Sequence, residues 1–428
     1  MKKLLHIIRY GAISPIWSWL SIALIKIGGP KVAAYFSYRS IDWGDMKEGQ
    51  TILCLYRESF IKDVIELRKR TALNYPIVMG GFTRFQMAWF PQNMQVQTFY
   101  QAYLNENERA IEQGTIYARH LIQLVNQKVP VQGILSANFD YWQDAVFKKV
   151  CKELDIPFLV LSREHPIIPK VCDYVTDRYR KADYHFEGTA IAVAGSSTKN
   201  VIEKVKTICA PEQVVITGLP RYDAWLDVDT SRSLEERPFI TLLTFTKGYY
   251  ADQTFVEVLQ LFCEAAEHHA NSPVTFLVKT KDAADTLAVK GMMNAYGLLN
   301  LQCDHEVNLF DVLPRSRMVI NYNSLSLIEA VMARAWIAIP VWGQCMGRGG
   351  EAMYSIDNSK VANVVNFTSR PDVLMDTISA CVAGQLHPIS DENIRDFLGE
   401  YIHIPDSGTY CQEFENFVMT NLQDKSKL

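Results

Sequence analysis

Short runs of apolar, often β-branched residues alternate along the chain with longer stretches in which apolar residues recur every three or four positions. The short runs are typical of buried strands and the longer stretches of helices, so the alternation predicts parallel α/β domains. In the first half, the predicted strands are residues 51–56, 76–79, 96–99, 133–136, 157–161, 190–194 and 214–217. The predicted helices among them include residues 62–71, 106–127 and 141–154.

A polar stretch, residues 227–237 (DVDTSRSLEER), interrupts this pattern and predicts an exposed linker between two domains. The pattern then restarts, with predicted strands at residues 239–244, 274–278, 318–321, 337–341 and 361–364 and helices at 254–268, 325–335 and 371–382. We therefore predict an α/β protein with two Rossmann-like domains, residues 28–226 and 238–405, facing each other across a cleft. Residues 406–428 contain a last helical pattern that could cross back to the first domain.

Residues 1–27 combine a long uncharged run with flanking cations, which predicts an amphipathic N-terminal segment. Their uncharged run, residues 10–25, is shorter than the ~20 residues that span a bilayer, and no signal-peptide cleavage site follows it. The segment carries two tryptophans and four flanking cations: Trp17, Trp19, Lys2, Lys3, Arg9 and Lys26. Such a segment suits an anionic membrane interface, although it can equally be a first helix packed on the body of the protein.

Composition narrows the class of protein. The length of 428 residues exceeds what one hydrophobic core usually supports, and the 48% hydrophobic content excludes a disordered chain. Because 43 lysines and arginines face 47 aspartates and glutamates, a nucleic acid is not an expected partner. The nine cysteines are scattered, without a C-x-x-C pair, so we expect no disulfide framework and no zinc site, and we expect a reducing cytoplasm.

The junction at residues 318–343 (MVINYNSLSLIEAVMARAWIAIPVWG) carries the clearest candidate chemistry. A predicted strand ends there, Asn323 and Ser324 can cap the helix that follows, and Glu329 lies about one turn inside it. The hydroxyls of Ser324 and Ser326 can donate to a diphosphate, and Glu329 can accept from a pair of sugar hydroxyls. An ordinary capped crossover helix would show the same spacing.

Two segments resemble known families. The N-S-x-S-x-I-E-A helix start and the P-V-x-G after the next strand resemble the donor-binding signature of GT-B glycosyltransferases and related nucleotide-sugar epimerases. Residues 190–226, with the turn T-G-x-P-R-x-D, are similar to bacterial surface-polysaccharide transferases, including capsule and lipopolysaccharide sugar transferases and CDP-glycerol polyol-phosphate transferases. The resemblance spans roughly residues 130–400. It implies a GT-B fold with the acceptor in the first domain and a nucleotide-sugar donor in the second.

The chain departs from these families after the second strand of the second domain. Where the polyol-phosphate transferases carry K-P-H-P, this sequence has VKTKD (residues 278–282), so a CDP-alcohol donor is disfavoured and the donor base stays open. Hydroxyls and cations that follow strands of this domain are our candidates for binding donor phosphates: Thr244, Thr246, Lys247, Lys279, Lys281 and Arg348. Surface loops with solvated lysines are the alternative.

The candidate general base lies in the first domain. Transfer to a sugar hydroxyl needs a group that removes its proton, and the predicted strand at residues 157–161 is followed by Glu164 and His165. Asp140, beyond the preceding strand, is a rival base. A Glu164–His165 ion pair that braces the loop before Pro166 is the structural alternative.

Together these observations favour a metal-independent glycosyltransferase that moves a sugar from a nucleotide-sugar to a bacterial surface glycan or lipid-linked glycan. We expect it in the cytoplasm, peripheral to the inner face of the membrane. No D-x-D motif follows a predicted strand, so we expect no metal and no cofactor beyond the nucleotide-sugar. The alternatives are a CDP-alcohol polyol-phosphate transferase, a nucleotide-sugar 2-epimerase and an inactive GT-B scaffold.

Overall fold

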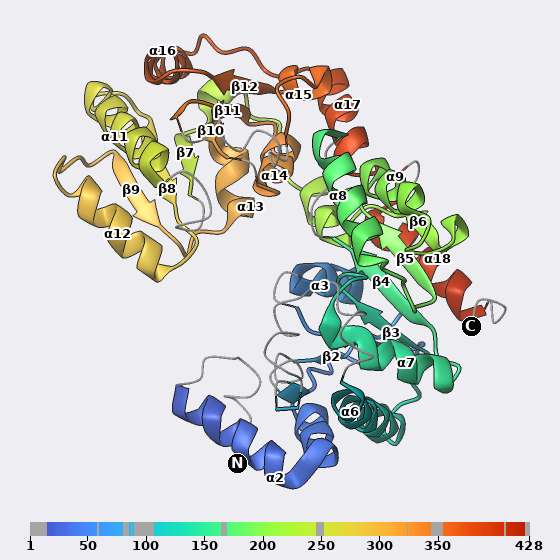
Figure 1. The fold of residues 1–428 in the computed structure, drawn as a ribbon. Helices are drawn as coiled ribbons and strands as arrows, with labels where there is room; N and C mark the ends of the chain where they lie inside the picture. Colours follow the sequence, from blue (N-terminus) through green and yellow to red (C-terminus); the bar gives the residue numbers. More distant parts are fainter. Residues whose placement is uncertain are drawn as a thin grey trace. The chain divides into compact units, whose positions relative to one another are not determined.

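The computed structural model describes residues 15–57, 60–79, 85–86, 88–89, 107–163, 169–244, 252–322, 324–343, 354–405 and 408–423. The chain divides into two compact units (Figure 1). Unit 1 comprises Met1–Pro166, Asp173–Asp223 and Ile402–Leu428, and unit 2 comprises Ile167–Cys172 and Ala224–Tyr401.

Unit 1 is built on a six-stranded parallel sheet with the order β2-β1-β3-β4-β5-β6. Its strands are β1 (Ile52–Leu55), β2 (Ile77–Val78), β3 (Gly133–Ser136), β4 (Phe158–Ser162), β5 (Ala190–Val193) and β6 (Val214–Ile216). Its helices include α2 (Pro15–Arg39), α3 (Ile61–Arg70), α6 (Glu108–Asn126), α7 (Ala145–Glu153), α8 (Pro169–Ala182), α9 (Ser196–Val205) and α18 (Tyr410–Gln423). The central strands are buried throughout because helices cover the sheet, which explains their continuous apolar runs.

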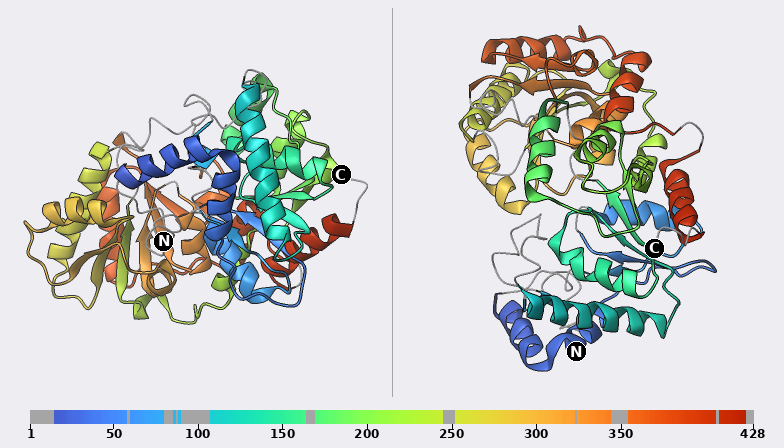
Figure 2. Two further views of the ribbon diagram at one scale, coloured as in Figure 1. Left: turned by 90° about the horizontal axis from the view of Figure 1, so that it is seen from below. Right: turned by 45° about the vertical axis from the view of Figure 1, so that its right-hand side comes forward.

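Helix α2 is bent, and its second half packs on α6 (Figure 2). The bend lies at Gly29, whose φ of +73° suits glycine, and Pro30 follows it. Ala33, Ala34 and Ser37 are buried in this contact, and the Ser37 hydroxyl lies 2.7 Å from the Tyr117 hydroxyl. None of the described helices is long and apolar enough to cross a bilayer.

The last helix, α18, packs in unit 1 although the whole of unit 2 precedes it in the chain. The carboxylate of Asp223 accepts hydrogen bonds from the backbone N–H of Tyr410 (2.7 Å) and Cys411 (2.9 Å), and so caps the helix. Gly218 has a φ of +67°, and a Cβ there would lie 2.3 Å from the Tyr410 ring. The T-G-x-P-R-x-D turn is thus shaped around the start of α18.

Unit 2 contains a second six-stranded parallel sheet, with the order β12-β11-β10-β7-β8-β9. Its strands are β7 (Phe239–Leu243), β8 (Thr275–Lys279), β9 (Leu301–Asp304), β10 (Ser316–Ile320), β11 (Trp336–Pro340) and β12 (Val365–Thr368). Its helices include α10 (Asp223–Leu226), α11 (Asp252–His268), α12 (Ala283–Met293), α13 (Leu309–Val312), α14 (Ser326–Met332), α15 (Ser359–Ala362), α16 (Pro371–Val382) and α17 (Asp391–Tyr401).

Two Rossmann-like units confirm the predicted α/β fold class. One predicted strand differs from the structure, one strand was not predicted, and one predicted strand lies outside the described residues. Residues 361–364, predicted as a strand, belong to α15 and the turn after it, and the strand β12 begins only at Val365. Strand β9 was not predicted. The strand predicted at residues 96–99 lies outside the described residues.

The stretch predicted to be an exposed linker ends on a buried arginine. Arg237 is 2% exposed, and its guanidinium donates to the backbone oxygens of Ser316, Ala333 and Arg334. A buried guanidinium is stable only when such acceptors surround it, so this residue anchors the start of β7 within unit 2.

Candidate functional site

The strand order of unit 2 places its candidate site at one edge of the sheet. All six strands are parallel, so their carboxyl ends meet at the same edge. The chain forms β8 on one side of β7 and later β10 on the other, and ligands of such sheets bind where the strand order reverses. Thr244 follows β7, and Ser324 and Ser326 follow β10, so three predicted residues flank this point.

Thr244 is the most informative of them. Its backbone N–H donates to the Lys279 carbonyl at 3.1 Å, which fixes the residue beside the end of β8. Its hydroxyl oxygen is buried, and no hydrogen-bond partner for it occurs in the part of the chain that the structure describes. A buried hydroxyl without a partner costs about 1–3 kcal/mol, so this group is set to bind a ligand oxygen.

The hydroxyls after β10 form a network. The oxygens of Ser324 and Ser326 lie 2.8 Å apart, and the side-chain amide of Asn321 donates to the Ser326 oxygen at 3.2 Å. The Tyr354 hydroxyl, 30 residues later in the chain, donates to the Ser324 carbonyl at 3.1 Å and so holds the loop in place. Glu329 is 3% exposed, so its predicted contact with sugar hydroxyls requires that the ligand reach a buried carboxylate.

Lys279 and Lys281 lie in different surroundings. The Lys279 ammonium donates to the carbonyls of Thr280 (2.6 Å) and His305 (2.7 Å), which ties the end of β8 to the loop after β9. Lys281 is exposed beyond the end of the strand. Of these two predicted phosphate ligands, Lys279 has most of its donors committed to the protein, whereas Lys281 extends from the same edge.

His305 lies at this edge and was missed by the sequence reasoning. Its Nδ1 lies 3.2 Å from the Thr286 hydroxyl, which in turn lies 2.6 Å from the Thr280 hydroxyl. The histidine expected after β8 from the sequence resemblance is absent from VKTKD, but an imidazole is present after the neighbouring strand. The sequence signal for His305 is its position directly after LQCD, and this signal is readable only if LQCD is recognised as a strand.

Six predicted site residues cannot be placed. Thr246, Lys247, Asn323 and Arg348 in the donor set, and Glu164 and His165 among the candidate bases, lie outside the described residues. Their roles stay predictions.

The third candidate base, Asp140, follows β3 in unit 1. It is half-buried, and its carboxylate accepts a hydrogen bond from the Tyr179 hydroxyl at 3.2 Å. Oxygen acceptors of this kind can remove a proton from a sugar hydroxyl if the acceptor reaches them.

A charged cluster that the sequence did not reveal lies near Asp140, where the strand order of unit 1 reverses between β1 and β3. Arg57, after β1, donates to the buried Asp144 at 3.1 Å, and the hydroxyl of Ser136, the last residue of β3, donates to the same carboxylate. The Arg57 guanidinium also lies 4.6 Å from the centre of the Tyr141 ring. These contacts fix the loops around the edge of the sheet that holds Asp140.

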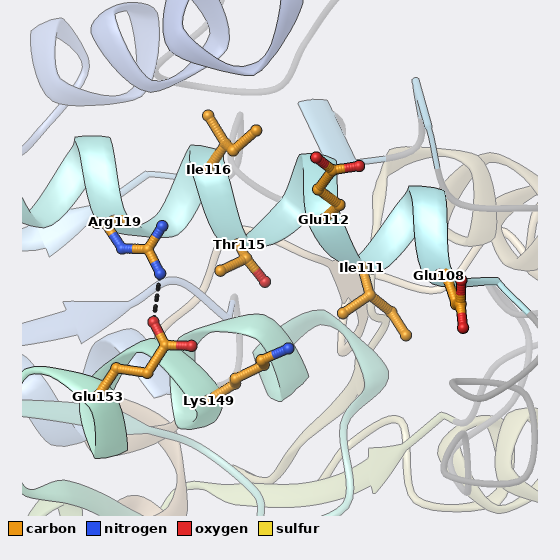
Figure 3. A pocket seen from close by; sticks show the side chains of 8 residues that line it. All are labelled: Glu108, Ile111, Glu112, Thr115, Ile116, Arg119, Lys149 and Glu153. Carbon is orange, nitrogen blue, oxygen red and sulfur yellow. Dashed lines mark hydrogen bonds and ion pairs between the residues drawn. The ribbon is translucent and has the colours of Figure 1, made fainter.

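A hollow on the outside of unit 1 is a different feature. It has a volume of about 710 Å³ and lies between the outer surfaces of α6 and α7 (Figure 3). Its lining consists of Glu108, Ile111, Glu112, Thr115, Ile116, Arg119, Lys149 and Glu153. No strand end and no predicted site residue contributes to it, and Arg119 and Glu153 pair across it. The ends of the strands, which carry the predicted site residues, are therefore the better candidates.

Comparisons with known proteins find similarity in structure only. No protein-family model matches the chain, and no curated protein matches it. A candidate UDP-N-acetylglucosamine 2-epimerase from Listeria monocytogenes superposes with a TM-score of 0.54 at 10% identity, covering 88% of this chain and 97% of that one. MnaA of S. aureus, solved with UDP, superposes with a TM-score of 0.50 at 10% identity, covering 87% and 97%. A glycosyltransferase from Rickettsia africae gives 0.48, with 88% and 100% covered at 10% identity.

At this level of identity the similarity concerns the fold. The two Rossmann-like units are those of the GT-B type, which glycosyltransferases and nucleotide-sugar epimerases share.

Proposed function

We propose that the protein is a glycosyltransferase that takes a sugar from a nucleotide-sugar bound at the β7–β10 edge of unit 2. The observation that carries this proposal is the buried hydroxyl of Thr244 at the reversal of strand order, which has no hydrogen-bond partner among the described residues. The hydroxyl network of Ser324 and Ser326 on the neighbouring strand end supports it, as does the nucleotide in the MnaA structure, which has this fold.

The proposed acceptor is a bacterial surface glycan, including capsule and lipopolysaccharide chains, made at the inner face of the cytoplasmic membrane. A base of unit 1, either Asp140, Glu164 or His165, takes the proton of the acceptor hydroxyl. The acceptor oxygen forms a bond to the anomeric carbon, and the bond from that carbon to the nucleotide's phosphate oxygen breaks. Hydroxyls and the cations Lys247, Lys281 and Arg348 stabilise the charge of the departing nucleotide without a metal.

Nucleotide binding tests the donor site directly. Thermal unfolding is measured with UDP, CMP, CDP, GDP and their sugars for wild type, Thr244→Val and the control Thr377→Val. Thr377 is a matched hydroxyl on α16 that bonds to the Val373 carbonyl of its own helix. We expect one nucleotide to raise the melting temperature of wild type and of the control, with an affinity about tenfold lower in Thr244→Val.

The ligand-free Thr244→Val variant should be at least as stable as wild type, because valine removes a buried hydroxyl that has no partner among the residues the structure describes. The proposal is wrong if no nucleotide stabilises the wild-type protein. If Thr244→Val and Thr377→Val bind a nucleotide equally well, the nucleotide lies elsewhere.

A second candidate function, a nucleotide-sugar 2-epimerase, is favoured by the fold of the Listeria protein. The two activities differ in what they need. An epimerase inverts the sugar's C2 centre with no acceptor present, which NMR of the incubated nucleotide-sugar detects. A transferase leaves C2 unchanged and releases the nucleotide when an acceptor glycan is added.

A further inference from the structure

The exposed side chains of α2 include three cations, an isoleucine and a tyrosine. In the second half of the helix, Lys31, Tyr35 and Arg39 are spaced four residues apart and are all exposed, so they share one face. Before the bend, Lys26 is exposed and Ile27 is 87% exposed. We call these five residues the α2 face.

The opposite side of α2 is committed to unit 1. Ile25, Ala33 and Ala34 are buried in the hydrophobic core of this unit, and Ser37 meets Tyr117 of α6. The α2 face therefore points away from a well-packed contact, and Figure 2 shows α2 beside α6 at an outer edge of unit 1. Among the described residues, no hydrogen bond or ion pair engages the side chains of Lys26, Lys31 or Arg39, so their charges are unneutralised.

Positive charge is concentrated at the start of the chain. The first 41 residues contain six lysines and arginines and no aspartate or glutamate, although the net charge of the whole chain is -4. The remaining residues therefore carry a net charge of -10. An acidic protein that keeps one purely basic segment has a surface complementary to a dense array of anions.

We propose that the α2 face binds the anionic surface of a lipid bilayer, with α2 lying in the interface. Lysines and arginines bind anionic headgroups, and exposed isoleucine and tyrosine side chains insert at headgroup depth. A soluble protein partner would not require both a lack of acids over 41 residues and an exposed isoleucine next to an exposed lysine.

A groove beside the bend provides a place for one headgroup. It has a volume of about 530 Å³ and lies between the bend of α2 and the start of α6. Lys26 belongs both to the α2 face and to this groove, and Arg109 lines it as well. Trp89 also lines it, and its indole N–H is buried without an acceptor among the residues that the structure describes. Glu108 lines the groove too, so the two cations outnumber one carboxylate there. A phosphate oxygen is an acceptor that the indole N–H and the excess positive charge would take.

Co-sedimentation with vesicles tests the proposal. The full chain is mixed with phosphatidylcholine vesicles that contain either no phosphatidylglycerol or about 30 mol% of it. Phosphatidylglycerol is anionic, so stronger binding to the second kind of vesicle measures the attraction between the protein's cations and the lipid. We compare wild type with the triple variant Lys26→Glu, Lys31→Glu, Arg39→Glu. A control triple variant, Lys152→Glu, Lys181→Glu, Lys204→Glu, makes the same change in net charge at exposed lysines of α7, α8 and α9.

We expect wild type and the control to bind the anionic vesicles and not the neutral ones. The α2-face variant should bind on the order of 100-fold more weakly, because each cation near an anionic surface contributes about fivefold. Thermal unfolding of each variant shows that it is folded. Equal binding by the two triple variants, or no binding by wild type, overturns the proposal.

Membrane binding and nucleotide binding can fail independently. The proposal that α2 binds a bilayer rests on the proposed function at the inner face of the membrane. The vesicle experiment contains no nucleotide, so it tests membrane binding alone. A protein that binds vesicles and no nucleotide would retain the α2 face and lose the proposed transferase activity.

Discussion

Lys148 carries its amino group in the interior of unit 1. Its side chain is 1% exposed, and its Nζ donates to the Phe139 carbonyl at 2.5 Å and contacts the Tyr184 hydroxyl at 3.3 Å. Burial lowers the pKa of Lys148 to about 8, even though the nearby Asp144 and Asp140 act in the opposite direction. The ammonium is therefore retained near neutral pH at a cost in stability.

This cost predicts a specific pH dependence. In the unfolded chain the lysine titrates near 10.4, so between pH 8 and about 10.4 the unfolded state binds more protons and stability rises with pH. Below pH 8 the full cost, about 3 kcal/mol, is present. Lys148→Met lacks this titration, and the Phe139 carbonyl still accepts from Tyr184. We expect wild type to gain up to about 3 kcal/mol relative to Lys148→Met between pH 7.5 and pH 10.

Denaturant unfolding of both proteins at the two pH values measures this gain. Taking the difference between them cancels the titration of buried tyrosines and cysteines, which is common to both. Lys149→Met, one residue along α7 and exposed, is the control and should show no pH-dependent difference. Parallel pH profiles for wild type and Lys148→Met would show that the buried lysine does not titrate in this range.

At the scale of elements, α18 depends on a residue nearly 190 positions before it. Asp223 is fully buried, and its two oxygens each accept one backbone N–H from the first turn of α18. The negative charge also suits the positive end of the helix. Asp223→Ala leaves both N–H groups unsatisfied, and we expect a loss of about 2 kcal/mol, with a smaller loss for Asp223→Asn.

Hydrogen exchange of the α18 amides locates the effect. Exchange at residues 410–423 should accelerate in Asp223→Ala. The matched control is Asp282→Ala, which removes the exposed cap of α12 in unit 2, where Asp282 accepts from the Asp285 N–H at 2.9 Å. Faster exchange of α18 in the control as well would mean that the capping bond at Asp223 is not what holds the helix.

The strands that the sequence predicted well share a physical property. β1, β3, β4 and β10 lie inside their sheets and are buried along their whole length, so continuous apolar runs mark them. β9 and β12 lie at the edges of the unit 2 sheet and are only partly buried, so their sequences LQCD and VNFT carry polar residues. Residues 361–364 (VANV) are mostly apolar and so resemble an edge strand, although they form the end of α15 and a turn.

Prediction of the site divides in a similar way. Strand ends could be found from the pattern, and these gave Thr244, Ser324 and Ser326. Contacts between residues distant in sequence could not be found, because spacing contains no information on which carbonyl a lysine meets. The bond from Lys279 to the His305 carbonyl and the Arg57–Asp144 pair are of this kind. That the Thr244 hydroxyl has no hydrogen-bond partner among the described residues likewise emerges only from the structure.

At the scale of the whole molecule, the chain order and the division into units do not coincide. Residues of unit 1 both precede and follow unit 2, and α18 supplies the last part of unit 1. Its buried side chains are mostly large and apolar: Tyr410, Cys411, Phe414, Phe417, Val418 and Asn421. Each buried apolar side chain of this size contributes about 1.5–3 kcal/mol, which together is comparable to the stability of a whole domain.

Truncation after Tyr401 should therefore destabilise unit 1, most of which lies more than 170 residues earlier in the chain, and leave unit 2, which ends at Tyr401, folded. Without α18, Gly218 loses the Tyr410 ring that packs against it, and the side chains of α3 that α18 contacts become exposed to water. We expect hydrogen exchange to rise in β1, β5 and α3 of unit 1, whereas β7 and β10 of unit 2 keep their protection. Because the proposed donor site is built entirely from unit 2, the truncated chain should still be stabilised by the nucleotide that stabilises wild type. Loss of protection in unit 2 to the same extent as in unit 1 would mean that the two units fold as one cooperative body.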